Sequence, residues 1–387
     1  MNEKVLMKGN DAISEAAIRA GCGAYFGYPI TPQNEIPAYM AKHMLEKGRI
    51  FIQAESEIGA VIMVYGAACA GVRSMTSSSS PGFSLKQEGI SYAAGADVPM
   101  VLVNVARGGP GLGNISPSQS DYFQSTRGGG HGDYYCIVLA PKSVQEAADF
   151  TYEAFDLAEK YRMPVIIQAD GLIGQMLESL ELPPAKDPKT LKPADWTVGN
   201  RNNQSNWKAR HITSIHLPPE ELEGKTKARF VRYEKIKADE VRFEYMPPGK
   251  DGIIVTGSKA ASGDIEAGDA DITLTAYGTC ARVCMGAKQL AEKEGIKVGL
   301  FRPISLWPFP YKALGKIAAG TKPILTVEMS LGQFIEDVKL AAFEVSNGAK
   351  RSEIHLLGHS GGMIPTDVEV FDEIKRIVNG KPAKGDN

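Results

Sequence analysis

The chain lacks the features that would direct it to a membrane or to nucleic acid. Its 387 residues contain no apolar stretch of about 18 residues, and the start has no apolar core typical of a signal peptide. The formal net charge is −2 and no basic block occurs, so nucleic-acid binding has no electrostatic footprint. We therefore expect a cytoplasmic protein with no membrane span and no nucleic-acid partner.

Cysteine is scarce, with five residues in the whole chain and no CxxC motif. Cys280 and Cys284 lie close in sequence, but no second pair is present to complete a metal or cluster site. Free cysteine behaves as a small apolar residue. The sequence therefore predicts buried, reduced thiols, and no metal or iron–sulfur cluster held by this chain.

Two cofactor-binding motifs are incomplete. The run Gly109–Gly113 lacks the full G-x-G-x-x-G spacing and is interrupted by Pro110, which argues against a nicotinamide-linked oxidoreductase. Asp170 and, further along, Asn202 imitate a diphosphate–magnesium motif, but Ala169 stands where that motif has a glycine. Neither motif is convincing.

What is present is a regular alternation of strand and helix patterns over residues 1–178. The apolar runs lack polar alternation, which favours a doubly wound parallel sheet covered by helices on both faces. The expected strands are Ala24–Gly27, Ile50–Gln53, Met75–Ser77, Met100–Val105, Ile137–Ala140 and Val165–Gln168.

The rest of the chain divides by composition. Residues 179–270 are rich in proline and polar residues and read as an irregular linker, with one helix within the charged segment 220–244. An insertion is expected near residues 248–270. Residues 271–387 return to alternating strands and helices, which predicts a second, smaller α/β domain.

The segment Tyr28–Pro32 restricts the position of one hydroxyl group. Pro29 and Pro32 fix their own φ and push the preceding residues toward extended geometry, so Thr31 has little freedom at the end of a strand. Ligands of open α/β sheets bind just beyond the carboxyl ends of strands. Thr31 is therefore either a binding group or the N-cap of a helix with Pro32 at its first position.

Two charged residues also follow strands. Glu57 begins an almost wholly apolar helix over residues 57–70, where it is either a first-turn acid stabilised by the helix dipole or a partly buried carboxyl that needs a partner. Such a helix is expected to be buried on nearly all sides and can bury one face in another subunit. Arg107 precedes a glycine-rich turn and is well placed to hold a carboxylate with two hydrogen bonds. The run Ser77–Gly82 either binds an anion or only forms a turn.

These motifs together resemble a known family. Tyr28–Pro32, Ser56–Ala60, Val105–Arg107 and Ser143–Glu146 occur in the order found in the α subunit of 2-oxoacid:ferredoxin oxidoreductases, which are thiamine-diphosphate enzymes. The run Ser118–Gln124 is similar to the branched-chain, 2-oxoisovalerate type. Tyr277–Arg282 and Arg302–Pro310 are similar to the family's transketolase-C-terminal-like domain, and the first domain to its pyrimidine-type thiamine-diphosphate domain.

The resemblance implies a role for each candidate residue. Glu57 corresponds to the glutamate that is presented to N1′ of the aminopyrimidine ring and promotes proton removal from the thiazolium ring. Thr31 and Arg107 correspond to residues that hold the carboxylate and carbonyl of the 2-oxoacid. The other cofactor contacts implied are Tyr28, Pro29 and Ile30.

The resemblance also implies partners and a reaction. Branched-chain 2-oxoacids are oxidatively decarboxylated to acyl-CoA and CO₂, with electrons passing to ferredoxin. Thiamine diphosphate is shared with a β subunit that holds Mg²⁺ and a [4Fe-4S] cluster, beside γ and ferredoxin-like δ subunits, so the chain is expected to be active only in the complex. The alternatives are the same enzyme class acting on 2-oxoglutarate or aryl pyruvates, or a catalytically silent scaffold subunit.

Overall fold

The computed structural model describes residues 4–198, 210–266, 268–320, 322–346 and 351–380, and the chain forms two compact units. Unit 1 contains Met1–Arg107 and Phe123–Tyr233, and unit 2 contains Gly108–Tyr122 and Glu234–Asn387. The division at residues 178 and 270 expected from composition stays a prediction. Asn202 lies outside the described residues. No helix in the described part of the chain is long and apolar enough to cross a bilayer.

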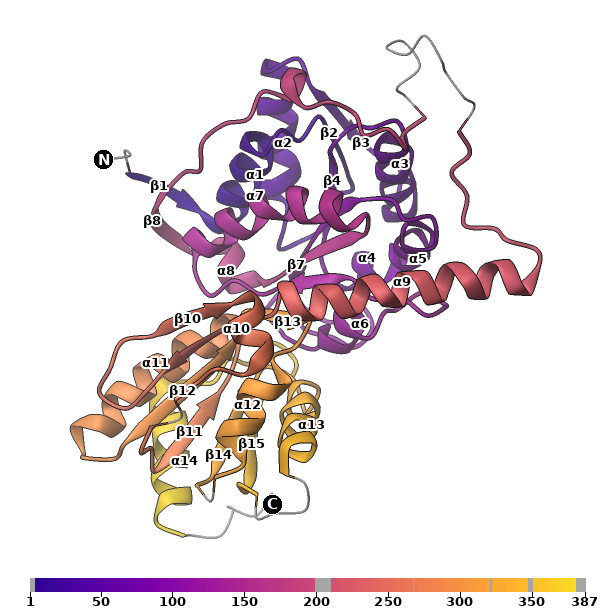
Figure 1. Cartoon of the computed structure of the whole chain (residues 1–387). Coiled ribbons are helices and arrows are strands. Elements are labelled where there is room, and N and C mark those ends of the chain that lie inside the picture. The colour runs from indigo at the N-terminus through magenta and orange to yellow at the C-terminus, as the bar shows by residue number, and fades with distance from the viewer. Residues whose placement is uncertain (1–3, 199–209, 267, 321, 347–350, 381–387) are drawn as a thin grey trace. The chain divides into compact units, whose positions relative to one another are not determined.

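Unit 1 is built on a parallel sheet (Figure 1). Its strands are β2 (Ala24–Gly27), β3 (Ile50–Gln53), β4 (Ser74–Ser78), β5 (Met100–Ala106), β6 (Ile137–Leu139) and β7 (Pro164–Asp170). Their order across the sheet is β6-β7-β5-β4-β2-β3 and all the pairs run parallel. The predicted strands and the doubly wound α/β class are confirmed.

Helices connect these strands and cover the sheet. They are α1 (Gly9–Arg19), α2 (Glu35–Glu46), α3 (Glu57–Cys69), α4 (Ser80–Leu85), α5 (Gln87–Gly95), α6 (Tyr122–Thr126), α7 (Val144–Tyr161) and α8 (Gly171–Gln175). Helix α1 packs on α2 and α7, whereas α3 packs on α5 and against β2 and β4. Because the chain goes from β2 to β3 on one side and then to β4 on the other, the strand order reverses at β2. Ligands of doubly wound folds bind outside the carboxyl ends of strands at such a reversal.

Asn10 does not cap helix α1, although its position in the sequence is typical of an N-cap. Helix α1 already begins at Gly9, with Lys8 at the N-cap position. The buried Asn10 amide instead donates to the carbonyl of Pro32 at 2.9 Å and to Glu35 Oε2 at 2.8 Å. Asn10 therefore fastens the turn that follows β2.

A short antiparallel pair lies beside this sheet and was not predicted. Strand β1 (Lys4–Lys8) pairs with β8 (Leu177–Glu181). Both strands expose every second residue, so neither has the continuous apolar run of the main strands. The pair covers a small apolar cluster that includes Ala12, Val144 and Leu180.

Unit 2 contains a second, mixed sheet. Its strands are β9 (Arg242–Met246), β10 (Ile253–Thr256), β11 (Ile272–Thr275), β12 (Val298–Pro303), β14 (Ile324–Glu328) and β15 (Ile354–Gly358), in the order β10-β9-β12-β11-β14-β15. The remaining elements are β13 (Ser305–Trp307), α10 (Gly257–Ser262), α11 (Gly278–Lys293), α12 (Tyr311–Ala318), α13 (Phe334–Ser346) and α14 (Asp367–Val378). Helices α11 and α14 pack together over an apolar core, and α12 packs on α13 (Figure 1). The smaller α/β domain is confirmed.

The segment expected to be an irregular linker contains regular structure. Helix α9 (Pro219–Asp239) confirms the helix predicted within 220–244, and a short 3₁₀ helix spans Pro188–Thr190. Strands β9 and β10 extend the sheet of unit 2 by antiparallel pairing. They were not predicted from the sequence because the neighbouring prolines are typical of irregular structure. A buried ion pair joins Glu244 of β9 to Arg302 of β12, with Arg302 Nε 2.7 Å from Glu244 Oε2. Residues 199–209 of the segment lie outside the described residues.

The five thiols are free. Cys22, Cys136, Cys280 and Cys284 are buried as expected, and Cys69 is half-buried. Burial raises the pKa of the Cys22 and Cys136 thiols to about 12, so both stay protonated at neutral pH.

Candidate active site

Thr31 lies in the turn after β2, at the carboxyl edge of the sheet. Its carbonyl accepts a hydrogen bond from Arg107 Nη1 at 2.8 Å, and its Oγ1 accepts one from Asn34 Nδ2 at 3.0 Å. Helix α2 begins only at Glu35, with Asn34 at the N-cap position, so the interpretation of Thr31 as an N-cap is wrong. A hydroxyl that accepts one hydrogen bond can still donate another.

The same turn contains Tyr28, Pro29 and Ile30, and Gln33 holds it in place. Buried Gln33 donates through Nε2 to the Tyr28 carbonyl at 3.1 Å and accepts from Ser77 Oγ of β4 at 2.5 Å. Tyr28 and Ile30 are half-buried, and Pro29 is exposed. Gln33 was not singled out from the sequence because the run Gln33-Asn34-Glu35 is typical of an exposed turn.

Glu57 is the first residue of α3. Ser56 caps this helix, since its side chain accepts from the Gly59 amide at 3.1 Å. The Glu57 side chain is buried, with 6% exposed. A Cβ added to Gly82 would lie 2.4 Å from Glu57 Oε1 and 2.3 Å from Ser78 Oγ. The carboxyl group therefore packs directly against the backbone of α4, where only a glycine fits.

Arg107 follows β5 and is also buried, with 7% exposed. Its amide donates to Ser80 Oγ at 2.9 Å, and that hydroxyl donates to the Arg107 carbonyl at 3.2 Å. Ser80 and Gly82 both belong to the first turn of α4. One turn of helix therefore lies against both Arg107 and Glu57, and Arg107 contacts Thr31, so the fold brings the three predicted residues together.

The serines at the end of β4 and the start of α4 have different roles. Ser77 bonds to Gln33, and Ser80 bonds to Arg107. The hydroxyls of Ser78 and Ser79 are fully buried and have no hydrogen-bond partner among the described residues. An unsatisfied buried hydroxyl costs about 1–3 kcal/mol. The Ser78 hydroxyl lies against Gly82 of α4, as the Glu57 carboxyl does.

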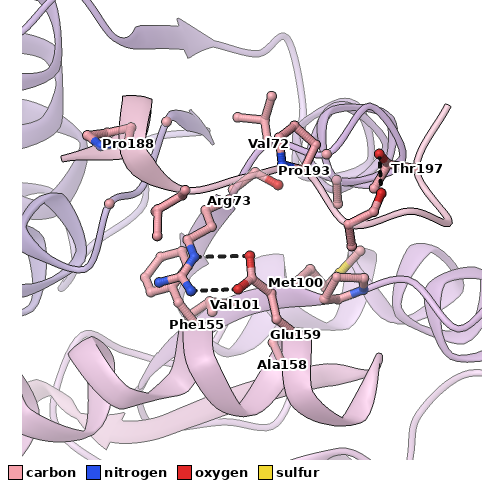
Figure 2. Close-up of a pocket in the computed structure, with 18 of the residues that line it drawn as sticks. Val72, Arg73, Met100, Val101, Phe155, Ala158, Glu159, Pro188, Pro193 and Thr197 are labelled. Carbon is pink, nitrogen blue, oxygen red and sulfur yellow. Dashed lines mark hydrogen bonds and ion pairs between the residues drawn. The ribbon is translucent and has the colours of Figure 1, made fainter. Parts of the chain in front are cut away.

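A cavity of about 320 Å³ lies at the opposite edge of the sheet, near the amino ends of β2, β4 and β5 (Figure 2). Its lining includes Met100, Phe155 and Arg73. The Arg73 guanidinium faces Glu159, with Nε 3.0 Å from Oε1, and it also donates to Asp156 Oδ1 at 2.7 Å. Lys186 Nζ lies 2.6 Å from Asp156 Oδ2, so two basic groups balance the two acids. The cavity is not part of the site around Glu57.

Helix α3 is not buried on all sides within this chain, contrary to expectation. Ile58 and Ile62 are 47% and 42% exposed. Strand β3 is at the edge of the sheet, and its Ile50 and Ile52 are 50% and 42% exposed. Exposed apolar side chains on adjoining elements are typical of an interaction surface.

Among the described residues, no three histidine, cysteine, aspartate or glutamate side chains gather closely enough to hold a metal ion. Residues 15–242 match the family described as "Pyruvate flavodoxin/ferredoxin oxidoreductase, thiamine diP-bdg", and residues 270–370 match "Pyruvate:ferredoxin oxidoreductase core domain II". The chain belongs to this family of thiamine-diphosphate-binding 2-oxoacid:ferredoxin oxidoreductase subunits. The family resemblance inferred from the motifs is confirmed.

The chain is also similar to individual proteins of this family. The chain is 45% identical over 374 residues to ketoisovalerate oxidoreductase subunit VorB of Methanothermobacter marburgensis, covering 96% of each chain. It is 35% identical to 2-oxoglutarate synthase subunit KorA of the same organism, covering 97% of this chain and 99% of that one.

Solved structures agree with the fold. The 2-oxoglutarate:ferredoxin oxidoreductase from Magnetococcus marinus, with 2-oxoglutarate, coenzyme A and succinyl-CoA bound, superposes with a TM-score of 0.81 at 26% identity. The match covers 97% of this chain and spans 66% of the length of that one. A split gene transketolase matches with a TM-score of 0.56 at 14% identity, which supports the fold alone.

Proposed function

We propose that this chain supplies the acid and the substrate-binding residues of a thiamine-diphosphate site that oxidises ketoisovalerate and related branched-chain 2-oxoacids. The observation that carries the proposal is that Glu57 and Arg107 both lie against the first turn of α4 while Arg107 also bonds to Thr31, in a chain 45% identical to a ketoisovalerate oxidoreductase subunit. In the overall reaction the oxoacid loses CO₂ and its acyl carbon forms a thioester with the sulfur of coenzyme A. Two electrons pass singly to ferredoxin, and the thiol proton is released.

The residues of the site fit the pyrimidine end of the cofactor. Its aminopyrimidine ring has ring nitrogens and an amino group along one edge, and the buried Ser78 and Ser79 hydroxyls have no hydrogen-bond partner among the residues that the structure describes. Glu57 is a buried carboxyl beside them that can give a proton to a ring nitrogen. When bound, the cofactor supplies the carbanion chemistry, whereas the protein orients and polarises it.

Arg107 and Thr31 suit a 2-oxoacid. A guanidinium presents several N–H donors in one plane, so Arg107 can hold a carboxylate while keeping its bond to the Thr31 carbonyl. The Thr31 hydroxyl can donate to the neighbouring keto oxygen. Because Arg107 is almost fully buried, this interaction is made away from bulk water, where it is stronger.

The proposal includes partner subunits. A β subunit would hold the diphosphate, Mg²⁺ and a [4Fe-4S] cluster, beside γ and ferredoxin-like δ subunits, with coenzyme A as a co-substrate. The exposed isoleucines of α3 and β3 support an assembly, because Ile58 and Ile62 follow directly on the helix turn that carries Glu57. A partner covering that face would lie next to the site.

The experiment uses the complex assembled with its natural partners. Glu57→Gln should reduce exchange of the thiazolium C2 proton with deuterium on the order of 100-fold or more, since an amide cannot donate the required proton. Glu55→Gln is the matched control, because Glu55 is an exposed neighbour whose carboxylate accepts a hydrogen bond from the adjacent Ser56 hydroxyl. Normal exchange in Glu57→Gln would contradict the proposed role.

The substrate is tested separately. We expect 2-oxoisovalerate with coenzyme A to bleach the iron–sulfur absorption of the complex without NAD. The 35% identity to 2-oxoglutarate synthase subunits makes 2-oxoglutarate the second candidate. Faster bleaching with 2-oxoglutarate would replace the branched-chain assignment, and no bleaching with any oxoacid would favour a silent scaffold subunit.

A further inference from the structure

A row of buried polar side chains crosses three strands of the unit 1 sheet near its carboxyl edge. Asn104 of β5 is paired in register with Ser78 of β4 on one side and with Gln168 of β7 on the other. Paired residues of neighbouring strands project from the same face of a sheet, so these three side chains lie in line. Asn104 is 0% exposed and is the one polar residue of β5. A buried amide side chain needs hydrogen-bond partners, because burying it without them is costly.

The hydrogen bonds of the row fix how the Asn104 amide is turned. The backbone N–H of Ser80 donates to Asn104 Oδ1 at 3.2 Å. Because a backbone N–H can only donate, the Asn104 atom that faces it must be the oxygen, and Nδ2 must point the other way. Nδ2 donates to Gln168 Oε1 at 3.3 Å, and that oxygen also accepts from the Ser125 hydroxyl at 2.6 Å. Asn104 is therefore held from β7 and in turn holds the chain that follows β4.

Helix α4 receives this acceptor from outside itself. The first N–H groups of a helix have no acceptor within the helix, and a side chain at the N-cap position usually supplies one. Ser79 occupies that position in α4, but its side chain makes no capping hydrogen bond. Asn104 instead supplies an acceptor for the N–H of Ser80, the first residue of the helix. The start of α4 is thereby fixed to the neighbouring strand β5.

We propose that Asn104 is a positioning residue of the candidate active site, which fixes the first turn of α4 and, through that turn, Arg107 and the Glu57 carboxyl. The Ser80 hydroxyl on this turn bonds to the backbone of Arg107, and Gly82 lies against the Glu57 carboxyl. Asn104 acts through these contacts rather than on a ligand. The inference rests on the proposed function of Glu57 and Arg107.

The first experiment removes the acceptor in the complex assembled with its natural partners. Asn104→Leu keeps a similar volume but loses both hydrogen bonds, so the first turn of α4 should shift. Exchange of the thiazolium C2 proton should then fall about tenfold or more, since a misplacement of about 1 Å can cost on the order of 100-fold in rate. The KM for 2-oxoisovalerate should rise as well, because Arg107 is bonded to the same turn. Normal values of both in this variant overturn the inference.

Asn104→Asp tests whether the acceptor is what matters. A carboxyl group keeps an oxygen toward the Ser80 amide, and burial favours its protonated form, which can also donate to Gln168. The rate of C2-proton exchange and the KM should therefore return to within about threefold of the wild-type values. Equal defects in Asn104→Asp and Asn104→Leu contradict the inference.

Gln168→Leu is the matched control. It removes a buried amide of the same row, but it leaves the bond from the Ser80 amide to Asn104 in place. Both leucine variants should unfold at a lower urea concentration than wild type, because each leaves a buried polar partner unpaired. The rate of C2-proton exchange and the KM should change only in Asn104→Leu. Equal losses of exchange in the two leucine variants would reflect a general loosening of the fold and would overturn the inference.

The second experiment does not depend on catalysis. Hydrogen–deuterium exchange of backbone amides is followed by mass spectrometry at Ser80, in the complex and in the full chain alone. The Ser80 amide should be protected in wild type and should exchange about tenfold faster or more in Asn104→Leu, since its acceptor is gone. A Ser80 amide that exchanges in wild type as fast as an exposed peptide overturns the inference, even if Asn104→Leu does not assemble.

The two experiments separate this inference from the proposed function. Normal C2-proton exchange in Glu57→Gln removes the proposed role of Glu57 whatever the amide measurement shows. A rate that is lost in Glu57→Gln but normal in Asn104→Leu removes only the role of Asn104.

Discussion

Arg107 Nη1 donates a 2.8 Å hydrogen bond to the backbone carbonyl of Thr31. The bond connects the end of β5 to the turn after β2, two strands that are separated in the sheet by β4. The turn is also tied to β4, because Ser77 Oγ donates to Gln33 Oε1. The turn after β2 is therefore held by side chains from β4 and from the residue after β5 rather than by its own prolines alone, and each contact can be removed separately.

Arg107→Lys should raise the KM for the 2-oxoacid about tenfold or more, because a lysine cannot keep the Thr31 carbonyl and also bind a carboxylate with two donors. Steady-state kinetics of the complex measure this change. Arg49→Lys is the control: Arg49 also donates to backbone carbonyls, of Ile18 and Cys22, but at the amino edge of the sheet. Equal KM values for the two variants would count against substrate binding by Arg107.

Gly82→Ala should displace the Glu57 carboxyl, because the new methyl group would lie 2.4 Å from Oε1. A misplacement of about 1 Å can cost on the order of 100-fold in rate. Exchange of the C2 proton in the complex is the measurement. Gly224→Ala in α9 is the matched control, since its methyl group would have no neighbour within 4 Å and should leave the rate unchanged.

Glu244→Ala should lower the free energy of unfolding by about 3–5 kcal/mol, because it leaves buried Arg302 without its carboxylate. Urea denaturation of the chain, followed by circular dichroism, measures the loss. The double variant Glu244→Leu/Arg302→Met should recover much of it, since no charge then remains buried. If the double variant were as unstable as Glu244→Ala, the loss of stability would come from disruption of the strand and not from the unpaired buried charge.

Burial of Lys86, at the junction of α4 and α5, should affect how stability depends on pH. Its pKa is about 7 in the folded chain but near 10.4 for an exposed lysine, so between these values the unfolded chain binds more protons. The contribution of Lys86 to the free energy of unfolding therefore rises with pH, by at most about 1.4 kcal/mol per unit. The difference in unfolding free energy between wild type and Lys86→Met, measured from pH 6 to about pH 10, should show this rise. A difference independent of pH would contradict it.

Local patterns in the sequence were enough for the residues at strand ends. Thr31, Glu57 and Arg107 each follow an apolar run, and the carboxyl ends of parallel strands meet at one edge, so their proximity could be predicted. The strands themselves were predictable because runs such as 100–105 are apolar without interruption and suit a sheet covered on both faces.

Other features depend on tertiary packing and left no local signal. Lys86 lies in the polar run Lys86-Gln87-Glu88, which is typical of a solvated helix start, and it is buried only because α3 packs on α5. Strand β9 has a charged residue, Glu244, at a buried position, which is acceptable only because Arg302 comes from β12. Asn10 likewise looks like a local cap until its partner at Pro32 is known.

The exposed isoleucines of α3 and β3 have a practical consequence for anyone producing this polypeptide. Made by itself, it would display four large aliphatic groups along the edge strand β3 and the helix that follows it, namely Ile50, Ile52, Ile58 and Ile62. Such an exposed apolar surface promotes aggregation and inclusion-body formation. Recombinant production should therefore co-express the natural partner subunits from one plasmid, so that the exposed apolar surface is covered as the polypeptide leaves the ribosome.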